Sequence, residues 1–261
     1  MAPDTLSLEG KIAIITGSGK ENGIGAGIAR ALVRNGARVV INYVSDATAP
    51  RAAGVVDSIR ENGGQAIAVR ADVSTQEGAS KIVTETLKAF KADKVDILVN
   101  NAASTAVGPM MQATKEDLER VFNVNVFGPV YMMQAVVPVM PRGGRIINIS
   151  SIASKLGLSI IPLYGAAKAA QDQLAYTAAM ELGRTYGITI NQVAPGPVAT
   201  DGLGTGPTAD AIESTLVPLT RADARMGTTE DIADAVLLLV SEQSRWITGQ
   251  YISVSGGITG G

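Results

Sequence analysis

Apolar, β-branched runs of five to seven residues alternate with longer helical stretches along the whole chain, and this alternation limits the possible folds most. Strands that are apolar on both faces and alternate with helices are typical of a parallel sheet covered on each side. We therefore expect an α/β fold, a Rossmann-type doubly wound parallel sheet of seven strands with helices on both faces, in a single domain over residues 1–261. The expected strands are 11–16, 37–43, 65–70, 96–100, 145–150, 188–194 and 250–254, and the expected helices are 24–35, 50–62, 76–91, 115–141 (two helices), 162–186 and 229–241.

The composition excludes several classes of function. With 22 basic and 24 acidic residues, the formal net charge is −2, which gives no electrostatic reason to expect nucleic acid as a partner. Cysteine and histidine are both absent, so thiolate chemistry and Ser-His-Asp hydrolysis are excluded and no metal site is expected. No apolar run approaches the ~20 residues that cross a bilayer, and the first residues lack the pattern of a signal peptide. We expect a cytoplasmic protein.

A glycine-rich turn follows the first predicted strand and precedes the first predicted helix. Gly17, Gly23 and Gly25 allow the backbone to reverse tightly and to come close to a ligand. The helix that begins near Ile24 then offers free N–H groups and a partial positive charge to a pyrophosphate. Together with Ser18, these residues are predicted to bind a dinucleotide cofactor.

The end of the second strand favours NADP(H) over NAD(H) as that cofactor. A carboxylate about 20 residues beyond the glycines would bind the ribose 2′-OH of NAD, but Tyr43 stands at the expected position. Lys20 in the glycine-rich turn is an available partner for a 2′-phosphate, whereas the nearby Asp46 leaves NAD(H) open as the alternative. Asn42, Tyr43 and Ser45 are predicted to bind the cofactor at this end.

Residues after the third and fourth strands lie at the edge where such sheets bind ligands. Asp72, followed by Val73, could accept a hydrogen bond from an adenine amino group or cap the next helix. Asn100 ends the fourth strand and Ala102 follows it, where the strand order should reverse; an asparagine there could equally satisfy backbone groups. All four are candidates for the cofactor site.

Residues 196–227 interrupt the alternation, because this segment is rich in Gly, Pro and Thr. Loops of this length are uncommon in compact domains and are often lids. The segment leaves the C-terminal end of a strand, so we expect a substrate lid over about residues 198–227, in preference to a surface insertion without a role.

Tyr164 and Lys168 are four residues apart, and Ser151 lies thirteen residues before the tyrosine. Positions i and i+4 share one face of a helix. A phenol has a pKa of about 10, and a fixed ammonium beside it would lower that pKa. A serine hydroxyl could bind the same substrate oxygen. The three side chains could move a proton to or from a carbonyl or alcohol oxygen, although such Tyr-Lys pairs also occur on solvated helices.

In this order and spacing, the motifs resemble those of the short-chain dehydrogenase/reductase family, in its single-domain branch, over essentially the whole chain. Among its members, the chain looks most like fungal reductases of the naphthol-reductase kind, which share VxxNY at the end of the second strand and use NADPH. The motifs are TG…GIG (16–25), DV (72–73), NNAA (100–103), NVNVFG (123–128), YGAAK (164–168), PGPVAT (195–200) and TGQ…VSGG (248–257).

The resemblance implies a role for each matching residue. Tyr164 would protonate the carbonyl oxygen as NADPH delivers hydride, and Lys168 would lower the pKa of the tyrosine and hold the nicotinamide ribose. Ser151, with Ser150 as the alternative, would orient the substrate oxygen. Asn125 would bind a water that links Lys168 to solvent. The nicotinamide side of the cofactor would be held by Pro195, Gly196, Val198 and Thr200.

Three positions depart from the family pattern. Five residues, in place of three, separate Gly17 from Gly23; Ala103 replaces a glycine; and Ser255 replaces the aspartate of the usual VDGG. None of the three falls on the catalytic residues, so an active cofactor site is expected.

The segments expected to line the substrate pocket, near 104–111, 152–163 and 201–221, are mainly apolar. They suggest a bulky, mainly apolar or aromatic ketone, with secondary metabolism as one setting. A cyclase, isomerase or epimerase that binds the cofactor without net redox turnover is the alternative. The family also implies a homotetramer, with a dimer next, in which the small residues of 162–186 pack between subunits.

Overall fold

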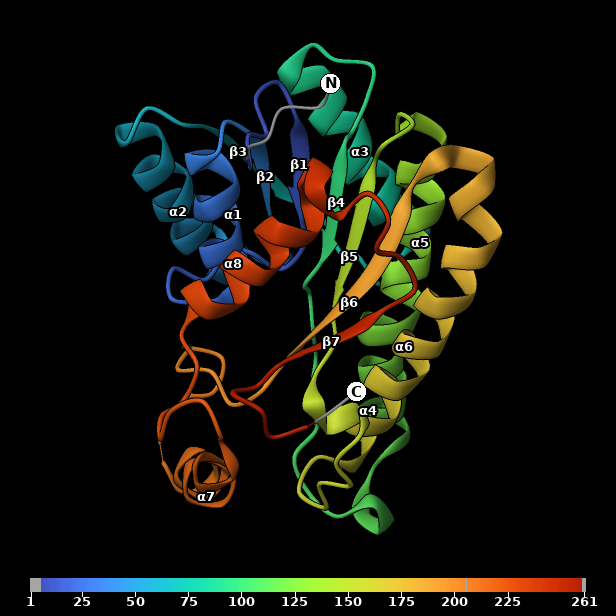
Figure 1. Cartoon of the computed structure of the whole chain (residues 1–261). Coiled ribbons are helices and arrows are strands. Elements are labelled where there is room, and N and C mark those ends of the chain that lie inside the picture. The colour runs from blue at the N-terminus through green and yellow to red at the C-terminus, as the bar shows by residue number, and fades with distance from the viewer. Residues whose placement is uncertain (1–5, 205, 260–261) are drawn as a thin grey trace.

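The computed structural model describes residues 6–204 and 206–259, in which the strands form one parallel sheet in the order β3-β2-β1-β4-β5-β6-β7 (Figure 1). The order reverses between β1 and β4, as in a doubly wound sheet, so the predicted fold class is confirmed. Every strand end lies within one residue of its predicted position. The strands are β1 (Ile12–Ile15), β2 (Arg38–Tyr43), β3 (Gln65–Arg70), β4 (Ile97–Asn100), β5 (Arg145–Ile149), β6 (Thr189–Pro195) and β7 (Tyr251–Val254).

Helices cover both faces of the sheet (Figure 1). Alternate residues of each strand point to opposite faces, so Ile15 packs in the apolar core on one side and Ile14 in the core on the other. None of the helices in the described ranges is long and apolar enough to cross a membrane. One face carries α1 (Ile24–Arg34), α2 (Ala49–Glu61) and α8 (Thr229–Val240), and the other carries α3 (Gln76–Phe90), α5 (Gly128–Val136) and α6 (Pro162–Leu182).

The stretch predicted as two helices over 115–141 is indeed divided. Helix α4 (Lys115–Phe122) and α5 are joined by a π-helical turn, Asn123–Phe127. Single π turns inside helices are frequent at functional sites. This one places Asn125 in the interior, with none of its side chain exposed.

The segment treated as a loop over 196–227 contains a helix, α7 (Pro207–Leu216). Proline at the first helical position and Asp210 in the first turn both favour a helix start. Because glycines and threonines surround this short helix, the sequence shows no clear helical period there. In Figure 1, α7 stands apart from the sheet, beyond the carboxyl ends of the strands.

Candidate active site

The glycine-rich turn packs directly against the end of β4. Gly17 has a φ of +61°, and a Cβ on it would stand 2.6 Å from the Cα of Ala102. A Cβ on Gly25 would stand 2.5 Å from Asn101 Nδ2 and 2.9 Å from the Cα of Ser18. Both positions therefore require glycine, and close packing fixes the conformation of the turn at the carboxyl ends of β1 and β4.

The first turn of α1 is left free to bind an anion. Its N-cap is Gly23, and no side chain in the described part of the molecule caps it. By contrast, Thr75, Thr114 and Thr228 cap α3, α4 and α8 through their hydroxyls. The free N–H groups at the start of α1 fit the pyrophosphate of a dinucleotide.

The side chain of Asn42 stabilises the glycine-rich turn through hydrogen bonds. Its Oδ1 accepts a hydrogen bond from the N–H of Gly17 at 3.0 Å, and its Nδ2 donates to the carbonyl of Ala71 at 3.0 Å. The backbone N–H of Ser18 also donates to the carbonyl of Asn42. This amide, predicted to contact the cofactor, thus ties together β1, β2 and the end of β3.

Charged pairs surround the end of β2. Asp46 forms an ion pair with Arg70, and Arg51 on α2 forms one with Asp201 at the start of the expected lid. Asp46 was the reason to keep NAD(H) as the alternative cofactor, and its pairing with Arg70 offsets its negative charge.

The expected adenine end is a surface hollow lined in part by Asp72. Its Oδ1 accepts hydrogen bonds from the N–H and hydroxyl of Ser74, so one oxygen of the carboxylate secures the turn before α3. Val73 is buried. Asn100 is also buried and donates to Asn148 on the neighbouring strand at 2.8 Å, as expected of an amide that satisfies polar groups at the strand end.

Ser151, Tyr164 and Lys168 meet beyond the carboxyl end of β5. Ser151 lies two residues beyond the end of β5, and its Oγ accepts a hydrogen bond from the N–H of Ala153 at 3.1 Å, which leaves its hydroxyl proton free to donate. Tyr164 and Lys168 share one face of α6, with the Nζ atom 5.7 Å from the centre of the phenol ring. The structure therefore gathers the three residues that spacing alone had linked.

The pKa of Tyr164 is raised in this structure, against the expected lowering by Lys168. Burial raises the pKa of Tyr164 to about 12, while the Ser151 hydroxyl lowers it and the charge of Asp172 raises it. The Nζ atom of Lys168 instead donates to the carbonyl of Ile149 at 2.7 Å and to Gln171 Oε1 at 3.0 Å. The ammonium therefore donates hydrogen bonds to these two acceptors, while its Nζ atom lies over the ring of Tyr164.

Lys168 is itself deeply buried, with 1% of the residue exposed. Burial lowers the pKa of its ammonium to about 8, against the charge of Asp172, which raises it. A buried ammonium with a pKa this low can change its protonation near neutral pH, which is a property of groups that take part in proton transfer.

Asn125 lies in the π-helical turn close to the same site. Its Nδ2 donates to the carbonyls of Ser104 and Val121, at 2.6 and 2.8 Å. Its buried Oδ1 has no hydrogen-bond partner within residues 6–204 and 206–259. Because buried polar atoms are normally satisfied, this oxygen fits the predicted contact with a water.

The residues expected on the nicotinamide side follow β6. Pro195 ends the strand, and Val198 forms a parallel bridge with Gly227. Gly196 lies against Ser255, whose Cα would stand 2.9 Å from an added Cβ, and Thr200 Oγ1 accepts from the N–H of Leu203. The hydroxyl of Ser255 accepts from the N–H of Ile258 at 3.1 Å, so the serine replacing the usual aspartate still holds its turn.

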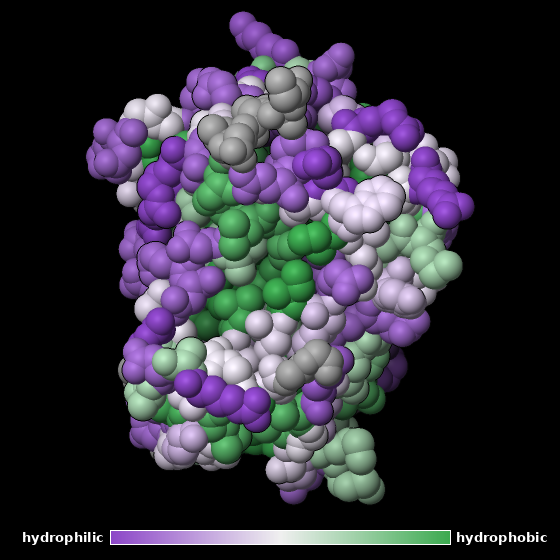
Figure 2. Space-filling view, in the orientation of Figure 1, coloured by the Kyte–Doolittle hydropathy of each residue, from purple (hydrophilic) through white to green (hydrophobic). Residues whose placement is uncertain are grey.

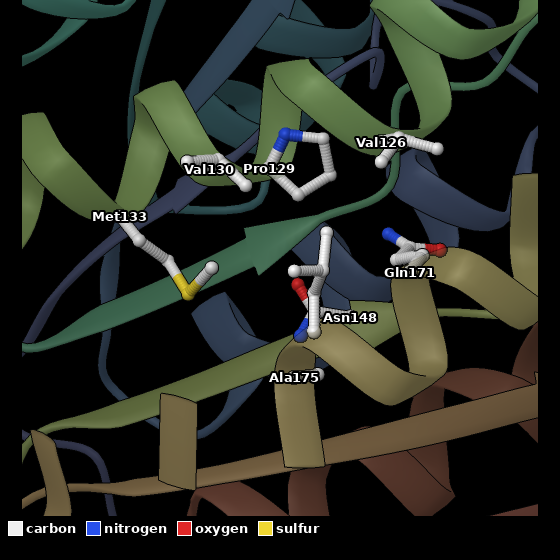
Figure 3. A pocket seen from close by; sticks show the side chains of 8 residues that line it. Val126, Pro129, Val130, Met133, Asn148, Gln171 and Ala175 are labelled. Carbon is white, nitrogen blue, oxygen red and sulfur yellow. The ribbon is translucent and has the colours of Figure 1, made fainter. Parts of the chain in front are cut away.

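A narrow pocket lies between α5 and α6, next to the helix segment that follows Lys168 (Figure 3). Gln171 and Asn148 both line it, from α6 and β5. Sequence reasoning missed Gln171 and Asp172, although their positions three and four residues after Lys168 on one helix were a readable signal. Within the described ranges, no group of acidic side chains is gathered as a metal site.

Comparison with known proteins establishes the family. A family model described as enoyl-(acyl carrier protein) reductase matches residues 17–259. The chain is 39% identical over 256 residues to the 7alpha-hydroxysteroid dehydrogenase of Escherichia coli (strain K12), covering 97% of this chain and 96% of that protein. It is 36% identical over 263 residues to a hydroxynaphthalene reductase-like protein of Metarhizium acridum (strain CQMa 102), covering 96% of each.

The fold comparison agrees. The structure is similar to the crystal structure of angucycline C-6 ketoreductase LanV with bound NADP, with a TM-score of 0.88, 35% identity, and 97% of this chain and 96% of that chain covered. The chain therefore belongs to the short-chain dehydrogenase/reductase family of oxidoreductases, as its motifs indicated.

Proposed function

We propose that this protein reduces the ketone of a mainly apolar substrate with NADPH, or oxidises the corresponding alcohol, with Tyr164 as the general acid or base. The observation that carries the proposal is the gathering of Ser151, Tyr164 and Lys168 at the carboxyl edge of the sheet, the same edge as the uncapped start of α1. A proton donor and an anion site at one edge are what a dinucleotide-dependent reduction needs.

The residues of the chain divide the proton chemistry between them. The cofactor, when bound, supplies the hydride to the carbonyl carbon. Tyr164, kept protonated by burial, donates its proton to the carbonyl oxygen, so the ketone becomes an alcohol. The Ser151 hydroxyl donates a hydrogen bond to the same oxygen and orients it. Lys168, with a water bound by Asn125, is proposed to resupply the proton to Tyr164.

Binding of NADP(H) is supported by the end of β2. Tyr43 stands in the acid position, and Asp46 is paired with Arg70. The ketoreductase similar to this chain was crystallised with NADP, as was a short chain dehydrogenase from Burkholderia cenocepacia J2315. Gly17, Ser18, Gly23, Ile24 and Gly25 are proposed to hold the phosphates, and Ser45 and Asp72 the adenosine end.

An apolar substrate is supported by the loops beside Tyr164. The N–H of Gly108 donates to the carbonyl of Ile160 at 3.0 Å, so two of the predicted lining segments lie side by side. Val107, Met110 and Met111 are exposed there. The segment 198–227, with α7, is proposed as the lid over this side of the crevice.

Initial rates with a panel of bulky aromatic and alicyclic ketones test the proposal. NADPH should be consumed in step with alcohol formation, and faster than NADH. Product formed without cofactor consumption would instead identify a cyclase, isomerase or epimerase. A preference for NADH would contradict the cofactor assignment alone.

Self-association as a tetramer, or else a dimer, is proposed from exposed apolar surface. Met180 and Tyr176 on α6 are 75% and 51% exposed. Figure 2 shows a second apolar, hollowed area over α8 and the edge strand β7, and a monomer rarely leaves large apolar patches uncovered. Sedimentation of the wild-type protein and of Met180→Glu tests this assembly, because the added charge should weaken it.

A cytoplasmic location stays a prediction, which imaging of the tagged protein in cells tests.

A further inference from the structure

A cluster of polar side chains lies behind the catalytic residues and has no part in the proton chemistry described so far. Asp172, one turn after Lys168 on α6, is at its centre. Burial raises the pKa of this carboxyl, and the hydroxyls of Ser150 and Ser154 and the charges of Lys168 and Lys155 act against that rise. The two hydroxyl oxygens and Asp172 Oδ1 are buried and have no hydrogen-bond partner among the described residues, so both hydroxyl protons are available to the carboxylate.

Tyr251 connects the cluster to the active site. Tyr251, on β7, donates from its hydroxyl to the carbonyl of Ser151 at 3.3 Å. Lys155 lies over the ring of Tyr251, with its Nζ atom 4.5 Å from the ring centre, and its charge also lowers the pKa of Asp172. The charged and titratable groups that interact with Asp172 are Lys155 and Lys168, which lower its pKa, and Tyr164 and Tyr251, whose pKa values its charge raises.

Lys168 needs a counter-charge. Its ammonium is buried, and its two hydrogen-bond acceptors, the Ile149 carbonyl and the Gln171 amide, are both neutral. A buried charge is costly unless it is paired with an opposite one. The carboxylate of Asp172 acts on Lys168 through its charge, without a direct hydrogen bond.

We propose that Asp172 is a positioning residue of this site: its carboxylate, faced by Ser150 and Ser154, is the counter-charge that keeps buried Lys168 protonated beside Tyr164. The same negative charge disfavours a phenolate, so it also keeps Tyr164 a proton donor. The inference rests on the proposed function only in that Lys168 and Tyr164 are taken to work as a pair.

The test is a pH titration of Lys168 and Tyr164 by NMR, in protein carrying isotope-labelled lysine and tyrosine. Lys168→Met and Tyr164→Phe assign the two signals. In Asp172→Asn, the pKa of Lys168 should fall by about 1 unit or more below its value of about 8, and that of Tyr164 should fall with it. Asp172→Glu should restore both values.

Glu181→Gln is the matched control, because it removes an exposed carboxylate from the same helix, thirteen residues beyond Lys168. It should leave both pKa values unchanged. An unchanged Lys168 pKa in Asp172→Asn, or an equal fall in the control, overturns the inference.

If Asp172→Asn does not fold, Ser154→Ala gives a second answer. Loss of that hydroxyl should raise the pKa of Asp172. Titration of Asp172 at acidic pH changes the chemical shift of Tyr164, so this change should occur at a higher pH in the variant. The same pH in variant and wild type overturns the inference. No titration uses substrate or cofactor, so its failure and that of the proposed reductase activity are separate results.

Discussion

The Asn42→Ala variant separates the structural role of this amide from the cofactor contact expected of it. Asn42 is 2% exposed, and its side chain joins the Gly17 N–H to the Ala71 carbonyl, each at 3.0 Å. Truncation leaves one partly buried donor and one buried acceptor without these partners. Each buried group left unsatisfied costs about 1–3 kcal/mol, so the two together should lower the free energy of unfolding by about 2–6 kcal/mol.

Urea unfolding followed by circular dichroism, at one fixed protein concentration, measures this loss. Asn62→Ala is the matched control, because Asn62 is exposed and its Nδ2 donates to the carbonyl of Ser58 at 2.8 Å. A surface change of this kind should stay within about 0.5 kcal/mol. Equal losses in the two variants would refute the argument that the turn depends on a buried amide.

Two further predictions concern the same site. A Cβ at Gly25 stands 2.5 Å from Asn101 Nδ2, so Gly25→Ala should weaken NADPH binding and lower stability by about 1–3 kcal/mol, measured by calorimetry and urea unfolding. Gly157→Ala, with nothing within 4 Å of the added Cβ, is its control, and equal effects would contradict the packing argument. Because the pKa of Lys168 is about 8 and that of Tyr164 about 12, kcat/KM should fall above about pH 8, as Lys168 loses its proton. In Lys168→Arg the guanidinium stays charged, so kcat/KM should no longer decrease above about pH 8. A decrease at the same pH in this variant would contradict the assignment to Lys168.

The strands and most helices could be predicted because their signal is local. A parallel strand buried on both faces is a run of apolar, mostly β-branched residues, such as Ile12–Ile15, which is bounded by Lys11 and Thr16. Helix α7 was missed because glycines and threonines flank its ten residues, which are too few to show a clear period.

Within the site, spacing could predict which residues meet but not their electrostatics. Tyr164 and Lys168 share a helix face, as four-residue spacing requires. The direction in which the Lys168 ammonium points depends on Ile149 and Gln171, and the pKa of Tyr164 depends on burial and on Asp172. Burial and partner choice arise from tertiary packing, so the sequence could not show that the tyrosine pKa is raised.

The role of Tyr164 as proton donor is tested most directly by Tyr164→Phe. With NADPH and a ketone that the wild-type protein reduces, the decay of the NADPH absorption band gives the rate. The variant should still bind NADPH, while turnover falls about 10²-fold or more, the usual contribution of a general acid. Unchanged turnover in Tyr164→Phe would contradict the account, because another group would then be supplying the proton.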